Sequence, residues 1–190
     1  MYTHRSPLLH KVQLSNISPG QTIYYMVAGS DTQYSFTYPL NGDSSGVYPM
    51  NVGLTVDLGQ TAVSQASVDA IIAMDPDFVL LAGDLAYADG WNPLWDDFGV
   101  FIEPLASQYP FLTTGGNHEF GGSENWQAYK SRYPTPFKGA GSTNPCYYGK
   151  EVGVVHLIAL CSYAGFDTDR WVLSSNCKIY ISLLLLLLSS

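Results

Sequence analysis

The stretch Phe78-Val79-Leu80-Leu81-Ala82-Gly83-Asp84 decides the fold. Residues 78–82 form an uninterrupted apolar run, which is typical of a strand buried on both faces of a parallel sheet. Asp84 follows directly after this run, so a carboxylate stands near the carboxyl end of the predicted strand. In open α/β sheets, that end of a strand faces the ligand crevice.

Strands and helices alternate on both sides of this run, with Pro76 ending one helix and Asn92-Pro93 opening the next. Pro104 predicts a kink or a split in the second helix. The strands are predicted from short apolar runs and the helices from the spacing of their apolar residues. The predicted elements are a strand at 52–56, a helix at 62–74, a strand at 78–82, a helix from 92, a strand at 111–114, a helix at 123–132, and strands at 146–150 and 154–160. This order predicts an α/β layered domain.

Shifts in composition divide the chain into segments. Strands predicted at 8–14, 22–27 and 34–38 are too few to close a β-sandwich, so they suggest the end of a β-module whose beginning is absent. The predicted segments are a β-module at 1–38, a linker rich in turn residues at 39–50, the α/β domain at 51–170 and a divergent low-complexity tail at 171–190.

Composition excludes several classes of protein. Apolar residues make up 46% of the 190 residues, enough for a core, so disorder is excluded as the main state. The 16 acidic and 8 basic side chains give a net charge of −8, which argues against nucleic acid and an anionic membrane surface as partners. No apolar window is long enough to span a membrane, and no signal peptide is visible. The number of cysteines, 3, is odd and none has CxxC spacing, so the sequence predicts neither a complete disulfide framework nor a zinc-thiolate site.

Polar residues follow the predicted strands at similar places. The strand ends continue into Asp57-Leu58-Gly59, into Gly83-Asp84-Leu85-Ala86-Tyr87 and into Gly115-Gly116-Asn117-His118-Glu119. Because carboxyl ends of parallel strands meet at one edge of a sheet, Asp57, Asp84 and Asn117 are expected to lie side by side there. The glycines let the backbone turn sharply at this carboxyl edge of the sheet, which we call the rim.

Each of these residues also has a structural interpretation. An Asp after a strand is commonly a turn former or the N-cap of the next helix. Tyr87 taken alone suggests packing, and Asn117 taken alone suggests a left-handed turn residue. The recurrence of oxygen donors, one imidazole and glycines at consecutive strand ends favours a common site.

The blocks Asp57-x-Gly59, Gly83-Asp84-x-x-Tyr87 and Gly116-Asn117-His118-Glu119 resemble the first three signature blocks of the purple acid phosphatases. These enzymes are dinuclear metallophosphoesterases. The resemblance implies an α/β (α+β) fold, in which part of a metallophosphoesterase β-sandwich is flanked by helices. The N-terminal strands likewise resemble the end of the fibronectin-III-like β domain that precedes the catalytic domain in the large enzymes of this family.

The resemblance also implies roles for the site residues. Asp57 and Tyr87 would bind a ferric ion, Asp84 would bridge the two metals, and Asn117 would bind a divalent ion, which is Zn, Mn or Fe. Asn117 and His118 would contact the substrate, and His118 would protonate the leaving oxygen. The implied reaction is hydrolysis of small phosphate monoesters by metal-activated hydroxide. The implied protein is secreted, extracellular or vacuolar, and the full-length form is a possible homodimer.

The sequence departs from the family pattern in its histidines. The last two family blocks supply three histidine ligands, but this chain has 4 His in total and no His-x-His. His156 aligns with a structural strand, and Val56 stands before Asp57 where the family has Gly. We therefore expect an incomplete chain, and its own activity is left open. A non-catalytic remnant and a related phosphodiesterase stay as alternatives, although Tyr87 and the acidic charge argue against the diesterase.

Overall fold

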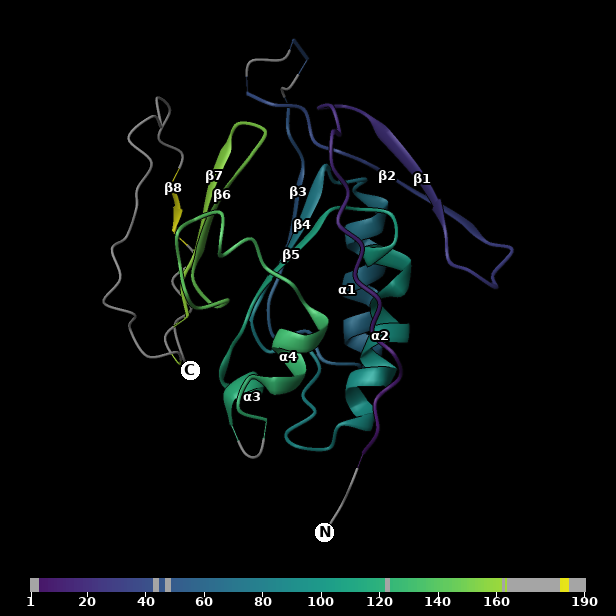
Figure 1. Ribbon diagram of the computed structural model, residues 1–190, viewed down its shortest axis with the longest axis vertical. Helices are drawn as coiled ribbons and strands as arrows, with labels where there is room; N and C mark the ends of the chain where they lie inside the picture. Colours follow the sequence, from purple (N-terminus) through teal and green to yellow (C-terminus); the bar gives the residue numbers. More distant parts are fainter. Residues whose placement is uncertain are drawn as a thin grey trace.

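The structure is a computed structural model that describes residues 4–42, 45–46, 49–121, 124–161 and 163, together with the backbone of 182–184 (Figure 1). Its elements in chain order are β1 (Thr22–Met26), β2 (Gln33–Thr37), β3 (Val52–Thr55), α1 (Ala62–Ala73), β4 (Phe78–Ala82), α2 (Pro93–Ala106), β5 (Phe111–Thr114), α3 (Asn117–Phe120), α4 (Gln127–Arg132), β6 (Tyr148–Val152), β7 (Val155–Ala159) and β8 (Ser182–Leu184). The predicted mixture of strands and helices is confirmed.

The central sheet has the order β3-β4-β5, and both of its strand pairings are parallel. Thr55 pairs with Leu81, and Leu81 pairs in turn with Thr113, so the three strands end at nearly the same level. All residues of β4 are buried, as expected for the middle strand of a parallel sheet. The chain segments that follow the three strands therefore leave the sheet at one edge.

The side chains of β4 point alternately into two different cores. Val79 and Leu81 pack into the cluster that contains the apolar faces of α1 and α2. Phe78 and Leu80 pack instead against residues of β6 and β7. This follows from the two-residue period of a strand. The molecule is therefore layered, with helices on one face of the central sheet and a second sheet on the other face (Figure 1).

The second sheet has the order β6-β7-β8. β6 and β7 pair in antiparallel fashion through a tight turn at Gly153, whose φ of +59° favours glycine. This confirms the strand pair predicted at 146–150 and 154–160. β8 adds to β7 in parallel. It lies within 171–190, where the sequence predicted no regular element.

The helices agree with their sequence signals, with two differences. Thr61 caps α1, because its hydroxyl accepts a hydrogen bond from the amide of Ser64. Asn92 and Pro93 open α2 as predicted, although the side chain of Asn92 makes no hydrogen bond to the first turn. α2 also continues past Pro104 to Ala106 without a split. Pro104 lies in the last turn, where few backbone bonds remain to be lost.

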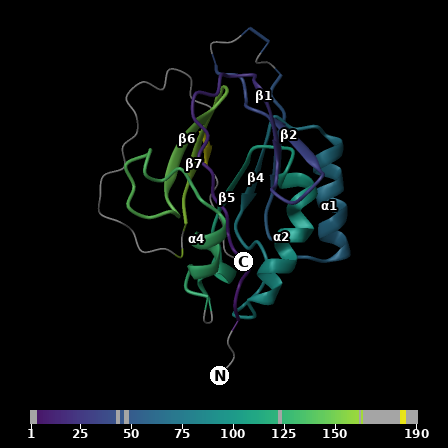
Figure 2. The same ribbon diagram turned by 45° about the vertical axis from the view of Figure 1, so that its right-hand side comes forward.

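The N-terminal region contains one pair of strands. β1 and β2 pair in antiparallel fashion, and Tyr25 donates a hydrogen bond to the carbonyl of Ser107 at the end of α2. Figure 2 shows this pair beside the helices. The strand predicted at 8–14 is wrong, because this segment has no strand partner and leaves most of its side chains exposed. The assignment of residues 1–38 to a fibronectin-III-like domain stays a prediction.

The packing of α1 on the central sheet can be tested with two valines of the same helix. Val68→Ala should lower the free energy of unfolding by about 2 kcal/mol, because it removes apolar volume from a fully buried position. Val63 is 77% exposed, so Val63→Ala should change stability by less than about 0.5 kcal/mol. Urea unfolding followed by circular dichroism measures both values. Equal losses in the two variants would contradict this packing.

Candidate metal centre

The segments that follow β3 and β4 stay hydrogen-bonded to each other beyond the strands. The amide of Asp57 donates to the carbonyl of Gly83 at 3.2 Å, and the amide of Leu58 donates to that of Asp84 at 3.1 Å. These bonds continue the parallel pairing of β3 with β4. They hold Asp57 and Asp84 next to each other at the edge of the sheet, as the sequence predicted.

Several non-glycine residues at this edge have left-handed backbone conformations. The φ angles of Asp57, Asp84 and Tyr87 are 48°, 52° and 50°. Such conformations cost about 1 kcal/mol or more for residues with a Cβ, and they cluster at functional sites. The backbone here is therefore held in place by its surroundings, and it turns the side chains toward a common point.

Asp57 and Tyr87 contact each other directly. The phenol of Tyr87 donates a hydrogen bond to Oδ1 of Asp57 at 2.9 Å. Burial raises the pKa of Tyr87, and the hydrogen bond and the negative charge of Asp57 raise it further. The phenol is thus protonated in the absence of a cation, and a strongly polarising ion would be needed to make it a phenolate ligand.

Asp84 lies at the buried side of the same group. It is 8% exposed, and its Oδ1 accepts a hydrogen bond from the amide of His118 at 2.9 Å. Burial raises the pKa of Asp84, and the neighbouring Asp57 carboxylate raises it further, although the His118 amide opposes this. The carboxyl groups of Asp57 and Asp84 are thus close enough for each to disfavour the ionised form of the other.

Glu119 is a residue of this region whose role the sequence analysis did not assign. It is 1% exposed, and its carboxylate accepts hydrogen bonds from the amides of Asp84, Leu85 and Gly116 at 2.8–2.9 Å. Burial raises the pKa of Glu119 to about 7 against the effect of these amides. The spacing of Gly116 and Glu119 matches that of a capping box, which was the available sequence signal.

His118 lies beside the oxygen donors. Its ring contacts that of Tyr87, with centroids 4.1 Å apart. Its Nδ1 and Oδ1 of Asp89 are 2.5 Å apart, so Asp89 orients the imidazole. Asp89 was also missed, because nothing in the sequence distinguishes it from an ordinary turn residue.

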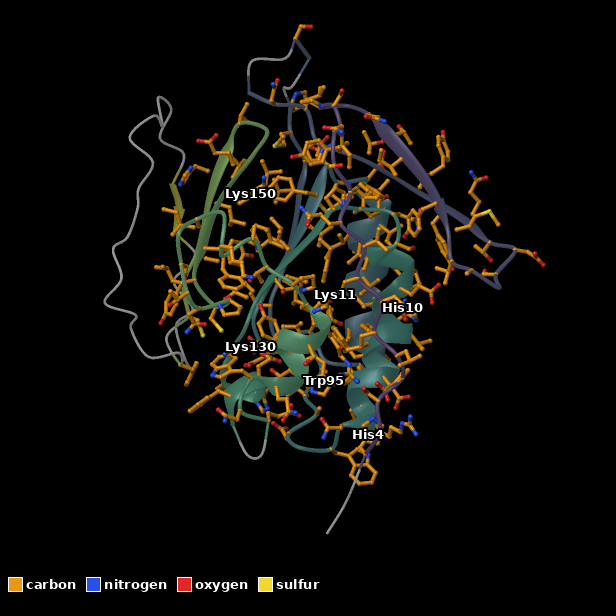
Figure 3. All side chains as sticks on the ribbon, viewed as in Figure 1. His4, His10, Lys11, Trp95, Lys130 and Lys150 are labelled. Atoms are coloured by element: carbon orange, nitrogen blue, oxygen red, sulfur yellow. The ribbon has the colours of Figure 1, made fainter. Side chains whose placement is uncertain are left out.

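The remaining predicted donor and the other histidines are less close to this group. Asn117 is the first residue of α3 and its side chain is exposed, so it stands at the rim without closing over it. Nε2 of His4 contacts Asp96 in α2, and Figure 3 shows His4 and His10 on the N-terminal segment beside the helices. His156 lies in β7, as expected of a strand residue.

The donor set fits a cation only in part. Carboxylate and phenol oxygens suit hard cations. Burial raises the pKa values of Asp84 and Tyr87, and the neighbouring Asp57 raises them further. Within the described part of the chain, no three His, Cys, Asp or Glu side chains come together as a metal-binding group. The residues present would therefore bind a metal weakly on their own, and a stable centre would need further ligands.

The fold and the site together describe a layered α/β domain with oxygen donors at the carboxyl ends of its central strands. A family model described as "Metallophos: Calcineurin-like phosphoesterase" matches residues 30–186, so the chain belongs to the calcineurin-like phosphoesterase family. The resemblance to purple acid phosphatases is likewise confirmed by relatives of that name.

Two of these relatives come from Arabidopsis thaliana. Purple acid phosphatase 22 is 33% identical over 187 residues, covering 94% of this chain and 42% of its own length. Probable purple acid phosphatase 20 is 34% identical over 171 residues, covering 86% and 39%. This chain thus spans about two fifths of the length of these relatives.

A solved structure shows the same fold. The purple acid phosphatase PPD1 from yellow lupin (Lupinus luteus) seeds superposes with a TM-score of 0.59 over 73% of this chain and 28% of its own, at 24% identity. The predicted metallophosphoesterase fold is confirmed. No described helix has the length and apolar character needed to cross a membrane.

Gly116, in the segment that follows β5, packs closely against Asp84, so a larger residue at this position should be destabilising. A Cβ on Gly116 would lie 2.3 Å from Oδ1 of Asp84 and 2.9 Å from its backbone nitrogen. Gly116→Ala should therefore lower the free energy of unfolding by roughly 1–3 kcal/mol.

Gly99 in α2 provides the control, because a Cβ there would meet nothing within 4 Å. Gly99→Ala should raise stability by about 0.4–1 kcal/mol. Thermal unfolding compares the two variants. A Gly116→Ala protein as stable as the parent would show that the rim is looser than described.

Proposed function

We propose that this chain contributes the first part of a dinuclear metal centre that hydrolyses small phosphate monoesters. The observation that carries the proposal is the convergence of Asp57, Asp84 and Tyr87 at the carboxyl edge of the central sheet. The relatives, named as acid phosphatases, support the same reaction. Because no three His, Cys, Asp or Glu side chains come together as a metal-binding group among the described residues, the proposed activity belongs to a centre that needs further ligands.

Each donor has a proposed role in holding the metals. Asp57 and Tyr87 would bind a ferric ion, Asp84 would lie between the two cations, and Asn117 would bind a divalent ion, which is Zn, Mn or Fe. A ferric ion suits this assignment because it is polarising enough to bind the Tyr87 phenol as a phenolate. A cation pair supplies an activated water and stabilises the attacking and leaving oxygens of the phosphate ester.

His118 is proposed to handle the proton of the leaving group. Asp89 occupies its Nδ1, so Nε2 is the nitrogen left to face a substrate at the rim. The contact with the Tyr87 ring keeps the imidazole next to the metal donors. In this position a protonated His118 would bind a phosphate oxygen and give its proton to the departing alcohol.

The proposal also covers partners and location. The net charge of −8 disfavours nucleic acid as a substrate, whereas a small phosphate ester is attracted by the metals themselves. A secreted or vacuolar location and a homodimer of the full-length protein follow only from the family resemblance. Tyr87 continues to disfavour a phosphodiesterase.

The metal ligand role of Tyr87 can be tested by colour. The chain refolded with ferric iron should show a visible absorption band from the phenolate–iron contact, and Tyr87→Phe should abolish it. Tyr24→Phe is a matched control, because Tyr24 lies exposed in β1, outside the rim. Visible spectroscopy at equal iron content compares the three proteins. A band that persists in Tyr87→Phe would show that the assignment is wrong.

The role of His118 can be tested by phosphate binding. Inorganic phosphate should bind the iron- and zinc-loaded chain about tenfold more weakly after His118→Ala, because one hydrogen bond to a charged oxygen is lost. His10→Ala, on the exposed N-terminal segment, should leave the affinity unchanged. Isothermal titration calorimetry measures both. Equal affinities of all three proteins would remove His118 from the substrate site.

A further inference from the structure

Two cysteines flank the β6–β7 pair, because Cys146 precedes β6 and Cys161 follows β7. In the β6–β7 pair, Tyr148 is the partner of Ala159. Cys146 precedes Tyr148 by two residues and Cys161 follows Ala159 by two residues, so the same register brings the cysteines opposite each other. Both cysteines lie just outside the two strands, and both belong to the helix-side cluster, so their side chains enter the same part of the core. Both are fully buried, in the cluster that contains Trp126 and Tyr129.

The two thiols are close enough to influence each other. The neighbouring Cys161 thiol and burial raise the pKa of Cys146, and the Cys161 thiol donates a hydrogen bond to the carbonyl of Gly115 at 3.2 Å. The backbone around them is fixed as well. Asn144 accepts a hydrogen bond from the amide of Cys146, and Tyr147 donates one to the carbonyl of Cys161 at 2.7 Å.

We propose that Cys146 and Cys161 form a cross-strand disulfide when the chain folds under oxidising conditions. Opposite residues of an antiparallel pair have Cα atoms about 4.5–5.5 Å apart. A disulfide requires about 4.4–6.8 Å, so the separation would suit a disulfide if the pairing of Tyr148 with Ala159 continued two residues outward to the cysteines. The pair is not a metal site, because no third His, Cys, Asp or Glu joins it among the residues whose placement is described.

The oxidant is a small disulfide such as oxidised glutathione. The thiolate of one cysteine attacks it, forms a mixed disulfide and releases one small thiol. The thiolate of the second cysteine then attacks the protein sulphur of the mixed disulfide and releases the second small thiol. The protons of the two cysteines end on the two released thiols, so the small disulfide is reduced and the protein is oxidised by two electrons.

The timing of the reaction follows from burial. In the folded chain, the hydrogen bond with Cys161 and burial raise the pKa of Cys146 far above its ordinary value. Thiols of this kind form little thiolate and are out of reach of a soluble oxidant. The bond therefore forms while β6 and β7 pair, before they pack on the central sheet. Once formed, it is equally protected from reductants.

The disulfide would support the rim without belonging to it. Cys161 contacts Gly115, which directly precedes Gly116 and the residues Asn117 and His118. A bond that joins the two segments next to Gly115 would restrict the movement of the residues that follow β5. The inference is independent of the proposed function, because it needs neither metal nor substrate.

Peptide mapping tests the disulfide without any variant. The full chain is unfolded in reductant, refolded in a mixture of reduced and oxidised glutathione, blocked with an alkylating agent and digested with trypsin. Lys150, labelled in Figure 3, lies between the two cysteines, so trypsin separates them into different peptides. The expected product is one species in which a bond joins these two peptides. Alkylated Cys146 and Cys161, or a bond from either of them to Cys177, would overturn the proposal.

Thermal unfolding provides the second test. The loop closed by the bond has about 15 residues, so a chain reduced in denaturant and refolded in reductant should have a Tm roughly 5–10 °C below that of the oxidised chain. Cys177→Ser should keep this difference, whereas Cys146→Ala and Cys161→Ala should abolish it. A difference that survives in either alanine variant would overturn the proposal. Oxidised glutathione added to the folded, reduced chain should leave both thiols free, and rapid oxidation would contradict the proposed order of events.

Discussion

The buried carboxylate of Glu119 is the interaction on which the rim depends. It accepts hydrogen bonds from the amides of Asp84 and Leu85, which follow β4, and from Gly116, which follows β5. Asp84, Leu85 and Gly116 are buried, and a buried N–H without a hydrogen-bond partner costs about 1–3 kcal/mol. One side chain thus holds the ends of two neighbouring strands together. It also explains why a carboxylate with a pKa raised to about 7 is placed in the interior.

The rim combines strain and like charge, and both are tolerated because the surrounding fold is rigid. Asp57, Asp84 and Tyr87 have left-handed backbones, and Asp57 raises the pKa of both of the others. A site built for stability alone would avoid each of these features. A cation placed among these oxygens would relieve the repulsion between them, so the arrangement favours metal over an empty rim.

The two-layer packing of β4 connects the rim to the second sheet. The helices α1 and α2 cover one face of the central sheet, β6 and β7 cover the other, and the rim lies at the carboxyl edge between them. Cys146 and Cys161 are an exception, because they belong to the helix-side cluster although they flank β6 and β7. Their contact with Gly115 is therefore a point where the second sheet bears directly on the residues of the site.

The sequence by itself determined the strand β4, the helix α1, the β6–β7 pair and the grouping of Asp57 with Asp84. These follow from local signals, namely apolar runs, helical spacing and polar residues directly after strands, which the parallel register then brings to one edge. Only the tertiary structure decided that residues 8–14 form no strand, because a strand needs a partner and apolar alternation does not supply one. It also decided the roles of Glu119 and Asp89 and the meeting of Cys146 with Cys161. Each of these depends on contacts between residues that are distant in the chain, and such contacts leave no local pattern.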